Sequence, residues 1–182
     1  MSSLNDRFEQ WREYNRISEA GEIARRAFVN NSFDGVLTMM GVVMGNFVVG
    51  VEDPAVVLVT GLSTALAIGI SGGWGAYLTE SAERRQDIDE LEQVTLTDLG
   101  DTKIGKASRA AVVTVAAVDG LSPFFAALVV VLPFFLVPLL PSVQVAYYAA
   151  LALALVALFA LGIYLGRLSK RSLIMSGPVS YT

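Results

Sequence analysis

Residues 30–50 read NNSFDGVLTMMGVVMGNFVVG, a run of aliphatic residues, Met and Gly that is interrupted by a single carboxylate, Asp34. An apolar run of about 20 residues is typical of a transmembrane helix. A second Asp-Gly pair, at Asp119, opens another such run, VDGLSPFFAALVVVL, at 118–132. The two stretches predict membrane spans that each carry an acid near one end.

The composition of the whole chain agrees with a membrane protein. Of its 182 residues, 54% are hydrophobic and 16% are charged, and the mean hydropathy is +0.57. Soluble domains carry about 25% charged residues. Residues 35–51 and 54–79 are uncharged, and residues 120–166 form an uncharged run long enough for two spans. We therefore predict an all-α integral membrane protein with four transmembrane helices in a lipid bilayer.

The basic residues predict the orientation of these helices. All 13 Lys and Arg residues lie before the first span, between the second and third, or after the fourth. The two other loops, at 51–55 and 141–144, contain none. Because loops rich in Lys and Arg stay in the cytoplasm, we expect a multi-pass protein of the cell membrane with both termini and the central loop cytoplasmic.

Charge and hydropathy divide the chain into five segments. The first, 1–27, has Leu, Phe and Trp on one helical face and charges on the other, which predicts a short amphipathic helix on the cytoplasmic surface rather than a cleaved signal peptide. The others are a first pair of spans (28–79), a charged cytoplasmic connection (80–109), a second pair (110–166) and a cytoplasmic tail or truncated fifth helix (167–182).

The two pairs of spans resemble each other. Asp34-Gly35 is echoed by Asp119-Gly120, and GAYL at 75–78 is echoed by GIYL at 162–165. Each pair has an even number of spans, so both pairs enter the membrane from the same side. The pattern predicts a parallel internal repeat, with halves related by an axis along the membrane normal.

The residue types restrict the chemistry. Cys and His are absent, which excludes thiolate catalysis, imidazole bases and Cys/His zinc sites. The sequence also lacks a P-loop, a nucleophile triad and a dinucleotide fingerprint. We therefore expect no enzyme activity, no tightly bound cofactor and no nucleic-acid partner. Transport and membrane assembly remain as functions.

The two acids within the spans are the leading candidates for a cation site. Both lie about 12 to 15 Å beyond the basic residues that precede their spans. Asp inside a membrane costs about 2.5–3.5 kcal/mol, and no Lys, Arg or His within the spans can offset the charge. One cation or proton site between the halves, shared by Asp34 and Asp119, is the hypothesis that follows.

Each candidate also has a structural interpretation. Asp34 and Asp119 can cap helix starts, Met40 and Met44 can pack rather than bind a soft metal, and the acids after span two can form a solvated helix face. The predicted metal ligands are Asp34, Asp119, Thr38, Met40, Met44, Glu80, Glu83 and Asp87.

These stretches resemble the vacuolar iron transporter family. Residues 30–45, NNSFDGVLTMMGVVMG, are similar to its first-helix signature, in which Asp-Gly follows an Asn-containing lead. Residues 67–92, AIGISGGWGAYLTESAERRQDIDELE, are similar to its second helix, which runs on into a charged cytoplasmic helix. Shorter matches are Ser71, Gly75, Tyr77, PLLP at 138–141 and ALFALGIYLG at 157–166.

The resemblance implies a homodimer or higher homo-oligomer that exports Fe(II) or Mn(II) from the cytoplasm against protons, through a path lined by Asp34. The chain departs from the family pattern at Gly72 and Ala76, where the family has Met and Glu. It also has a shorter cytoplasmic connection and lacks the usual fifth helix. These departures keep an alternative open, a non-transporting subunit that assembles through a small-residue face around Gly69 and Gly73.

Overall fold

The computed structural model describes the backbone of residues 20–175 and the side chains of residues 21–167. Within these ranges the chain is helical, and four helices are long and apolar enough to cross a membrane, which confirms the predicted all-α fold. The predicted amphipathic helix lies mostly outside the described residues. Residues 167–175 of the predicted tail continue the last helix, and the rest of the tail lies outside the described residues. The elements are α2 (Ala20–Val49), α3 (Pro54–Thr95), α4 (Lys103–Phe135), the 3-10 helix η1 (Val137–Leu139) and α5 (Val143–Met175).

The turn between α2 and α3 has clear local causes. Gly50 adopts φ +79° directly after α2, a left-handed conformation that glycine accepts without strain and that commonly ends helices. Asp53 precedes α3, and its Oδ1 accepts a hydrogen bond from the Ala55 amide at 2.9 Å. Pro54 occupies the first helical position, where its missing N–H costs nothing. Gly50 and Asp53 therefore fix where α2 ends and α3 begins.

The described chain divides into two compact units. The first contains the described residues up to Asn31 together with Leu66–Phe124, and the second contains Ser32–Ala65 and the described residues from Phe125 onward. Each unit thus takes segments from both predicted repeats. The internal repeat itself stays a prediction.

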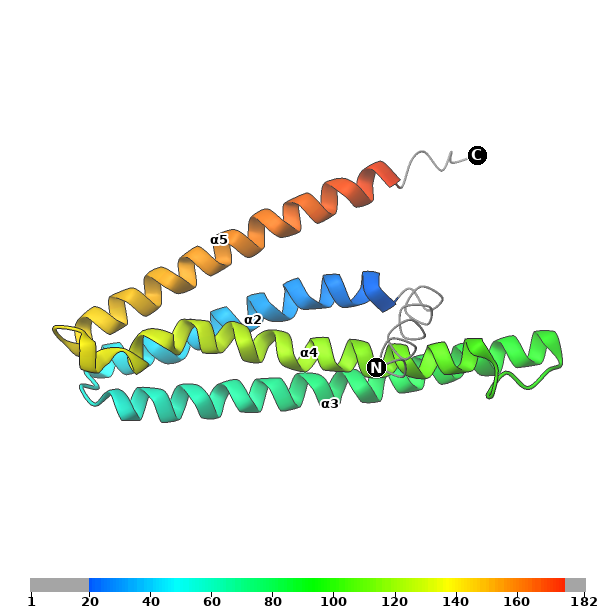
Figure 1. Cartoon of the computed structure of the whole chain (residues 1–182), viewed down its shortest axis with the longest axis horizontal. Helices are drawn as coiled ribbons and strands as arrows, with labels where there is room; N and C mark the ends of the chain where they lie inside the picture. The colour runs from blue at the N-terminus through cyan, green and yellow to red at the C-terminus, as the bar shows by residue number, and fades with distance from the viewer. Residues whose placement is uncertain (1–19, 176–182) are drawn as a thin grey trace, which may run out of the picture. The chain divides into compact units, whose positions relative to one another are not determined.

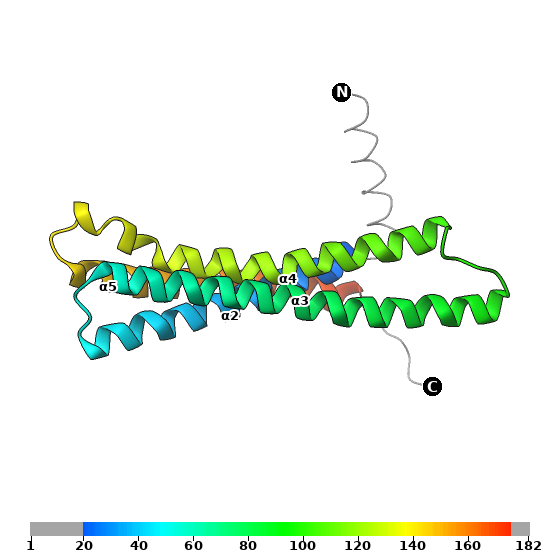
Figure 2. The ribbon, with the colours of Figure 1, turned by 90° about the horizontal axis from the view of Figure 1, so that it is seen from below.

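In the first unit, α3 and α4 run side by side and are joined by the turn at 96–102 (Figures 1 and 2). Their backbones approach closely where glycines face each other. A Cβ built on Gly120 would lie 2.7 Å from the carbonyl oxygen of Gly69 and 3.0 Å from the Cα of Gly73. The predicted small-residue face of the second span is therefore used inside the chain, against α4, at Gly69 and Gly73.

The second unit has a core of apolar side chains. Met39, on α2, has no exposed surface, and its sulfur would lie 3.3 Å from a Cβ built on Gly61. Tyr147, on α5, is 2% exposed, and its hydroxyl donates to the Val51 carbonyl at 2.8 Å. The ring of Tyr147 also contacts Phe47 and Phe134, with centroid separations of 5.3 and 4.9 Å.

Replacing Tyr147 with Phe is expected to lower the free energy of unfolding by about 1 kcal/mol. The ring contacts survive, but the Val51 carbonyl loses its donor from the Tyr147 hydroxyl. Thermal unfolding in detergent measures the change. Tyr148→Phe is the matched control, because Tyr148 is 62% exposed and also packs its ring on Phe47. An equal shift in both variants would contradict the role given to the Tyr147 hydroxyl.

Candidate functional site

One face of α2 combines a carboxylate, a hydroxyl and two glycines. Asp34, Thr38, Gly41 and Gly45 follow one another at helical spacing, and all four are exposed. No atom of the structure lies within 4 Å of a Cβ built on Gly41 or Gly45. We call these four residues the Asp34 face. The Asp34 face is an open surface of small residues with a carboxylate at one end.

Asp34 forms no hydrogen bond or ion pair with any side chain in the described part of the chain, although the helix around it is well packed. Val36 and Val43, which follow it on α2, are at most 1% exposed. The helix therefore has a buried apolar face and, separately, the exposed Asp34 face. An unpaired carboxylate in the middle of a membrane span costs about 2.5–3.5 kcal/mol.

The methionines of α2 divide between the two faces. Met44 is 47% exposed and lies next to Gly45 in the sequence, at the side of the Asp34 face. Met40 is half-buried. Met39, which the sequence did not single out, is fully buried and packs in the core of the second unit. Of the three, Met44 has the exposure that a ligand needs.

Asp119 lies in the first unit and has a specific partner. The side-chain amide of Asn31, on α2, donates to Asp119 Oδ1 at 2.7 Å. Pro123 has no N–H, so the carbonyl of Asp119 lacks the helical donor that would otherwise lie four residues later. That carbonyl faces α3, where a Cβ built on Gly72 would lie 2.9 Å from its oxygen. Asp119 is thus fixed through both its side chain and its backbone.

The contact at Gly72 explains a departure from the family pattern. A Cβ at 2.9 Å from a backbone oxygen forces a shift of one helix, and a longer side chain adds further overlap. The helices α3 and α4 are therefore in close contact at position 72, where the family carries Met. The structure uses this position for backbone packing in place of a possible sulfur ligand.

Glu80 is already paired inside the chain. Arg84 Nε lies 3.0 Å from Glu80 Oε2, and these side chains are only 14% and 16% exposed, respectively. Glu80 also interacts electrostatically with Asp119. Glu83 and Asp87, one and two turns along α3, are exposed and make no ion pair within the described residues. Glu80 thus belongs with Asp119 and Asn31, whereas Glu83 and Asp87 lie on an open helix surface.

The predicted metal ligands therefore fall into three places: the Asp34 face, the surroundings of Asp119, and the exposed end of α3. Among the described residues, no three Asp or Glu side chains lie close enough together to hold a metal ion. Asp34 belongs to the second unit and Asp119 to the first, so their pairing stays a prediction. The residue that sequence reasoning missed is Asn31, whose only signal was its place just before the Asp-Gly pair.

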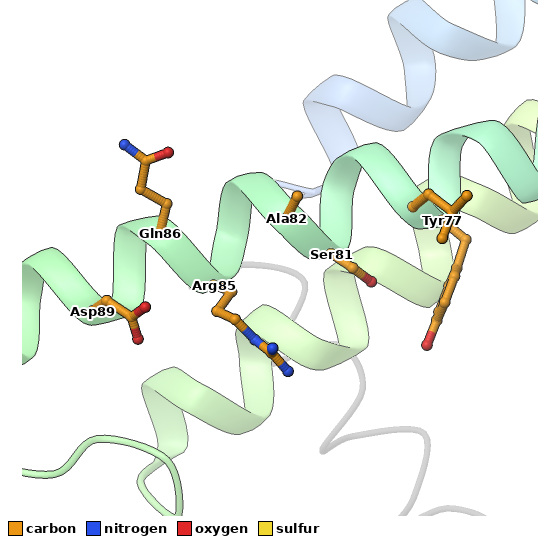
Figure 3. A pocket seen from close by; sticks show the side chains of 7 residues that line it. Tyr77, Ser81, Ala82, Arg85, Gln86 and Asp89 are labelled. Carbon is orange, nitrogen blue, oxygen red and sulfur yellow. The ribbon is translucent and has the colours of Figure 1, made fainter.

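A groove follows the exposed end of α3. Figure 3 shows Tyr77, Ser81 and Arg85 pointing to the same side of the helix, while Gln86 points to the other. The ring of Tyr77 stacks with that of Trp74 at a centroid separation of 5.9 Å. Aromatic pairs followed by basic residues are typical of the boundary between lipid and water. Trp74, Tyr77 and Arg85 follow this pattern on α3.

Comparison with known proteins identifies the family of this chain. A model of the VIT family matches residues 25–97, which include Asn31, Asp34 and Glu80. The uncharacterized protein MJ0645 of Methanocaldococcus jannaschii is 31% identical over 160 residues, covering 86% of this chain and 81% of that protein. No solved structure matches the chain. Members of the family are metal-ion transporters rather than enzymes, and this multi-pass membrane chain belongs to the VIT family.

Proposed function

We propose that this protein is a transporter that moves Fe(II) or Mn(II) out of the cytoplasm in exchange for protons, with Asp34 as the principal ligand of the ion. Family membership supports metal-ion transport. The observation that carries the more specific proposal is the exposed, unpaired carboxylate of Asp34 on a face otherwise made of Thr and Gly. A membrane protein retains such a group at a cost, which favours a role in transport.

The chemistry of the Asp34 face suits a divalent cation. A carboxylate and a hydroxyl supply oxygen ligands, and the sulfur of the exposed Met44 adds a softer ligand that Fe(II) tolerates better than Mg(II) does. Weak, incomplete coordination also favours transport, because an ion that binds a full set of ligands leaves slowly.

One chain supplies too few ligands, so the proposed transporter is a homodimer or higher homo-oligomer. Two α2 helices can approach closely along Gly41 and Gly45, because neither glycine has a neighbour within 4 Å. The approach would bring two copies of Asp34 to one path and remove both carboxylates from lipid. An isologous contact of this kind uses the same face on each chain.

The alternative function is a non-transporting subunit that assembles through small residues. The sequence predicts that such a subunit would assemble through the face around Gly69 and Gly73. In the structure these two glycines contact α4 of the same chain. An assembly role would therefore also have to use the Asp34 face. Transport accounts for the carboxylate on that face, whereas assembly alone does not.

Uptake into proteoliposomes tests the proposal. Purified protein is reconstituted, and initial uptake of Fe(II), Mn(II), Co(II) and Zn(II) is measured with and without a pH gradient. We expect Fe(II) or Mn(II) to accumulate faster than in protein-free vesicles. A proton gradient directed out of the vesicles should increase the rate of metal uptake. Equal uptake of all four metals with and without protein would contradict a transport function and leave the assembly role.

The proposed orientation has its own test. The sequence contains no Cys, so a single introduced Cys reports its side of the membrane. Glu52→Cys, in the short α2–α3 turn, should react in whole cells with an impermeant maleimide, because the positive-inside rule places this turn outside. Asp89→Cys should react only after the cells are opened. The reverse pattern would overturn the topology with cytoplasmic termini.

A further inference from the structure

The hydrogen bond between Asn31 and Asp119 joins α2 to α4 within the first unit. The Asn31 amide nitrogen and Asp119 Oδ1 lie 2.7 Å apart, within the usual range of an N–H···O bond. In the described part of the chain, the side chains that act on Asp119 are Asn31, through this bond, and Glu80, through charge repulsion. The negative charge of Glu80 is itself offset by Arg84. The Asn31 amide is therefore the favourable side-chain partner of this carboxylate.

The backbone around Asp119, which accepts this hydrogen bond, is closely packed against α3. On its α3 side, Asp119 lies against Gly72, and the next residue, Gly120, lies against Gly73, at distances that leave no room for a Cβ. Rotating α4 at this point would force backbone atoms into α3. The backbone that carries the Asp119 carboxylate is consequently held in place against α3, and Asn31 of α2 binds to this carboxylate.

Asn31 and Asp34 are three residues apart on the same continuous helix. Successive residues of an α-helix are rotated by about 100°, so the two side chains point about 60° apart and their relation is fixed. A rotation of α2 that breaks the bond from Asn31 would turn Asp34 through the same angle. The direction of the Asp34 side chain is therefore fixed relative to that of Asn31 within α2.

We propose that Asn31 and Asp119 are positioning residues for transport: their hydrogen bond sets the rotation of α2 about its own axis and so holds Asp34 toward the ion path. The inference rests on the proposed function. It gives the two acids different tasks, with Asp34 contacting the ion and Asp119 acting through Asn31.

The test combines transport with a direct measure of helix rotation. Met39→Cys places the single thiol of the protein at a position with no exposed surface. Adding Asn31→Ala should raise the rate at which a membrane-permeant maleimide labels this thiol by about fivefold or more. Without the reporter, Asn31→Ala should lower metal uptake at subsaturating concentration by about tenfold, because loss of the hydrogen bond to Asp119 lets misaligned states accumulate.

Two further variants make the result specific. Asn30→Ala is the matched control, because Asn30 is the exposed neighbour of Asn31 and makes no hydrogen bond with the described side chains. It should leave both measurements unchanged. The exchange Asn31→Asp with Asp119→Asn keeps a carboxylate facing an amide but swaps the helices that carry them. It should restore labelling and uptake to within about threefold of the wild type.

Several outcomes would overturn the inference. Normal uptake in Asn31→Ala would do so, and so would reduced uptake with unchanged labelling of Met39→Cys, because Asn31 would then act on the ion itself. A failure of the exchange variant to restore slow labelling would show that the bond does not hold α2. If Asn31→Ala does not fold, Asn31→Ser is labelled in its place. Absence of metal uptake by the wild type would reject the proposed function, while labelling would still decide whether the bond sets helix rotation.

Discussion

Replacing Asp34 with Asn is expected to reduce metal uptake by more than about 100-fold while the protein folds and assembles normally. The amide keeps the size of the side chain but loses the charge that attracts a divalent cation. Even groups that only orient a metal ligand cost 10- to 100-fold when removed, so loss of the ligand itself should cost at least this much. Initial uptake rates in proteoliposomes measure the effect.

The stability of this variant separates a transport role from a structural one. Asp34 makes no hydrogen bond or ion pair with another side chain in the described part of the chain, so the amide breaks no contact there. The thermal midpoint in detergent should stay the same or rise, because an expensive charge leaves the membrane. Asp101→Asn, at an exposed position of the α3–α4 turn, is the matched control and should transport normally. Normal transport in Asp34→Asn would reject Asp34 as the ion ligand.

Replacing Gly120 with Ala is expected to destabilise the protein by about 1–3 kcal/mol, the usual cost of forcing an extra carbon into a packed interior. A Cβ at this position would meet the carbonyl oxygen of Gly69 and the backbone of Gly73 at 2.7 to 3.1 Å. Backbone atoms cannot move aside as side chains can, so α3 and α4 must separate. Gly120→Leu should prevent folding. Thermal unfolding in detergent measures the first change, and recovery of monodisperse protein measures the second.

Gly75→Ala is the matched control for this prediction. Gly75 lies on α3, and no atom is found within 4 Å of a Cβ built on it. Ala favours helix over Gly by about 0.5–1 kcal/mol, so Gly75→Ala should leave stability unchanged or increase it. Equal destabilisation by Gly75→Ala and Gly120→Ala would show that glycine is needed for reasons other than close approach of the two helices.

The sequence predicted the helices well because the bilayer restricts what a chain can do. Uncharged runs about 20 residues long have few alternatives to a spanning helix, and the four predicted spans are present. The helix α3 continues into the charged segment as far as Thr95, which agrees with the resemblance of residues 67–92 to a helix that runs on into a charged one. The first 19 residues are outside the described structure.

The site was harder to predict than the helices. The exposure of Asp34 on a Gly-rich face follows from spacing along one helix, so the sequence could suggest it. The bond from Asn31 to Asp119 joins residues far apart in the sequence, and it depends on how α2 packs in the first unit. In the sequence, Gly72 looks like a missing ligand, whereas in the structure a side chain at this position would meet the carbonyl of Asp119.

The length of α3 has a mechanical consequence. Its 42 residues extend about 63 Å, whereas a bilayer with its headgroups is about 40–45 Å thick, so roughly 20 Å of helix stands beyond the membrane. The turn at its tip is tied down by the Leu99 amide on Glu92 and by Arg109 on the Gly100 carbonyl, at 2.7 and 2.8 Å. Because α3 is one continuous helix, a force on this turn would be transmitted along α3 to the glycine contact beside Asp119.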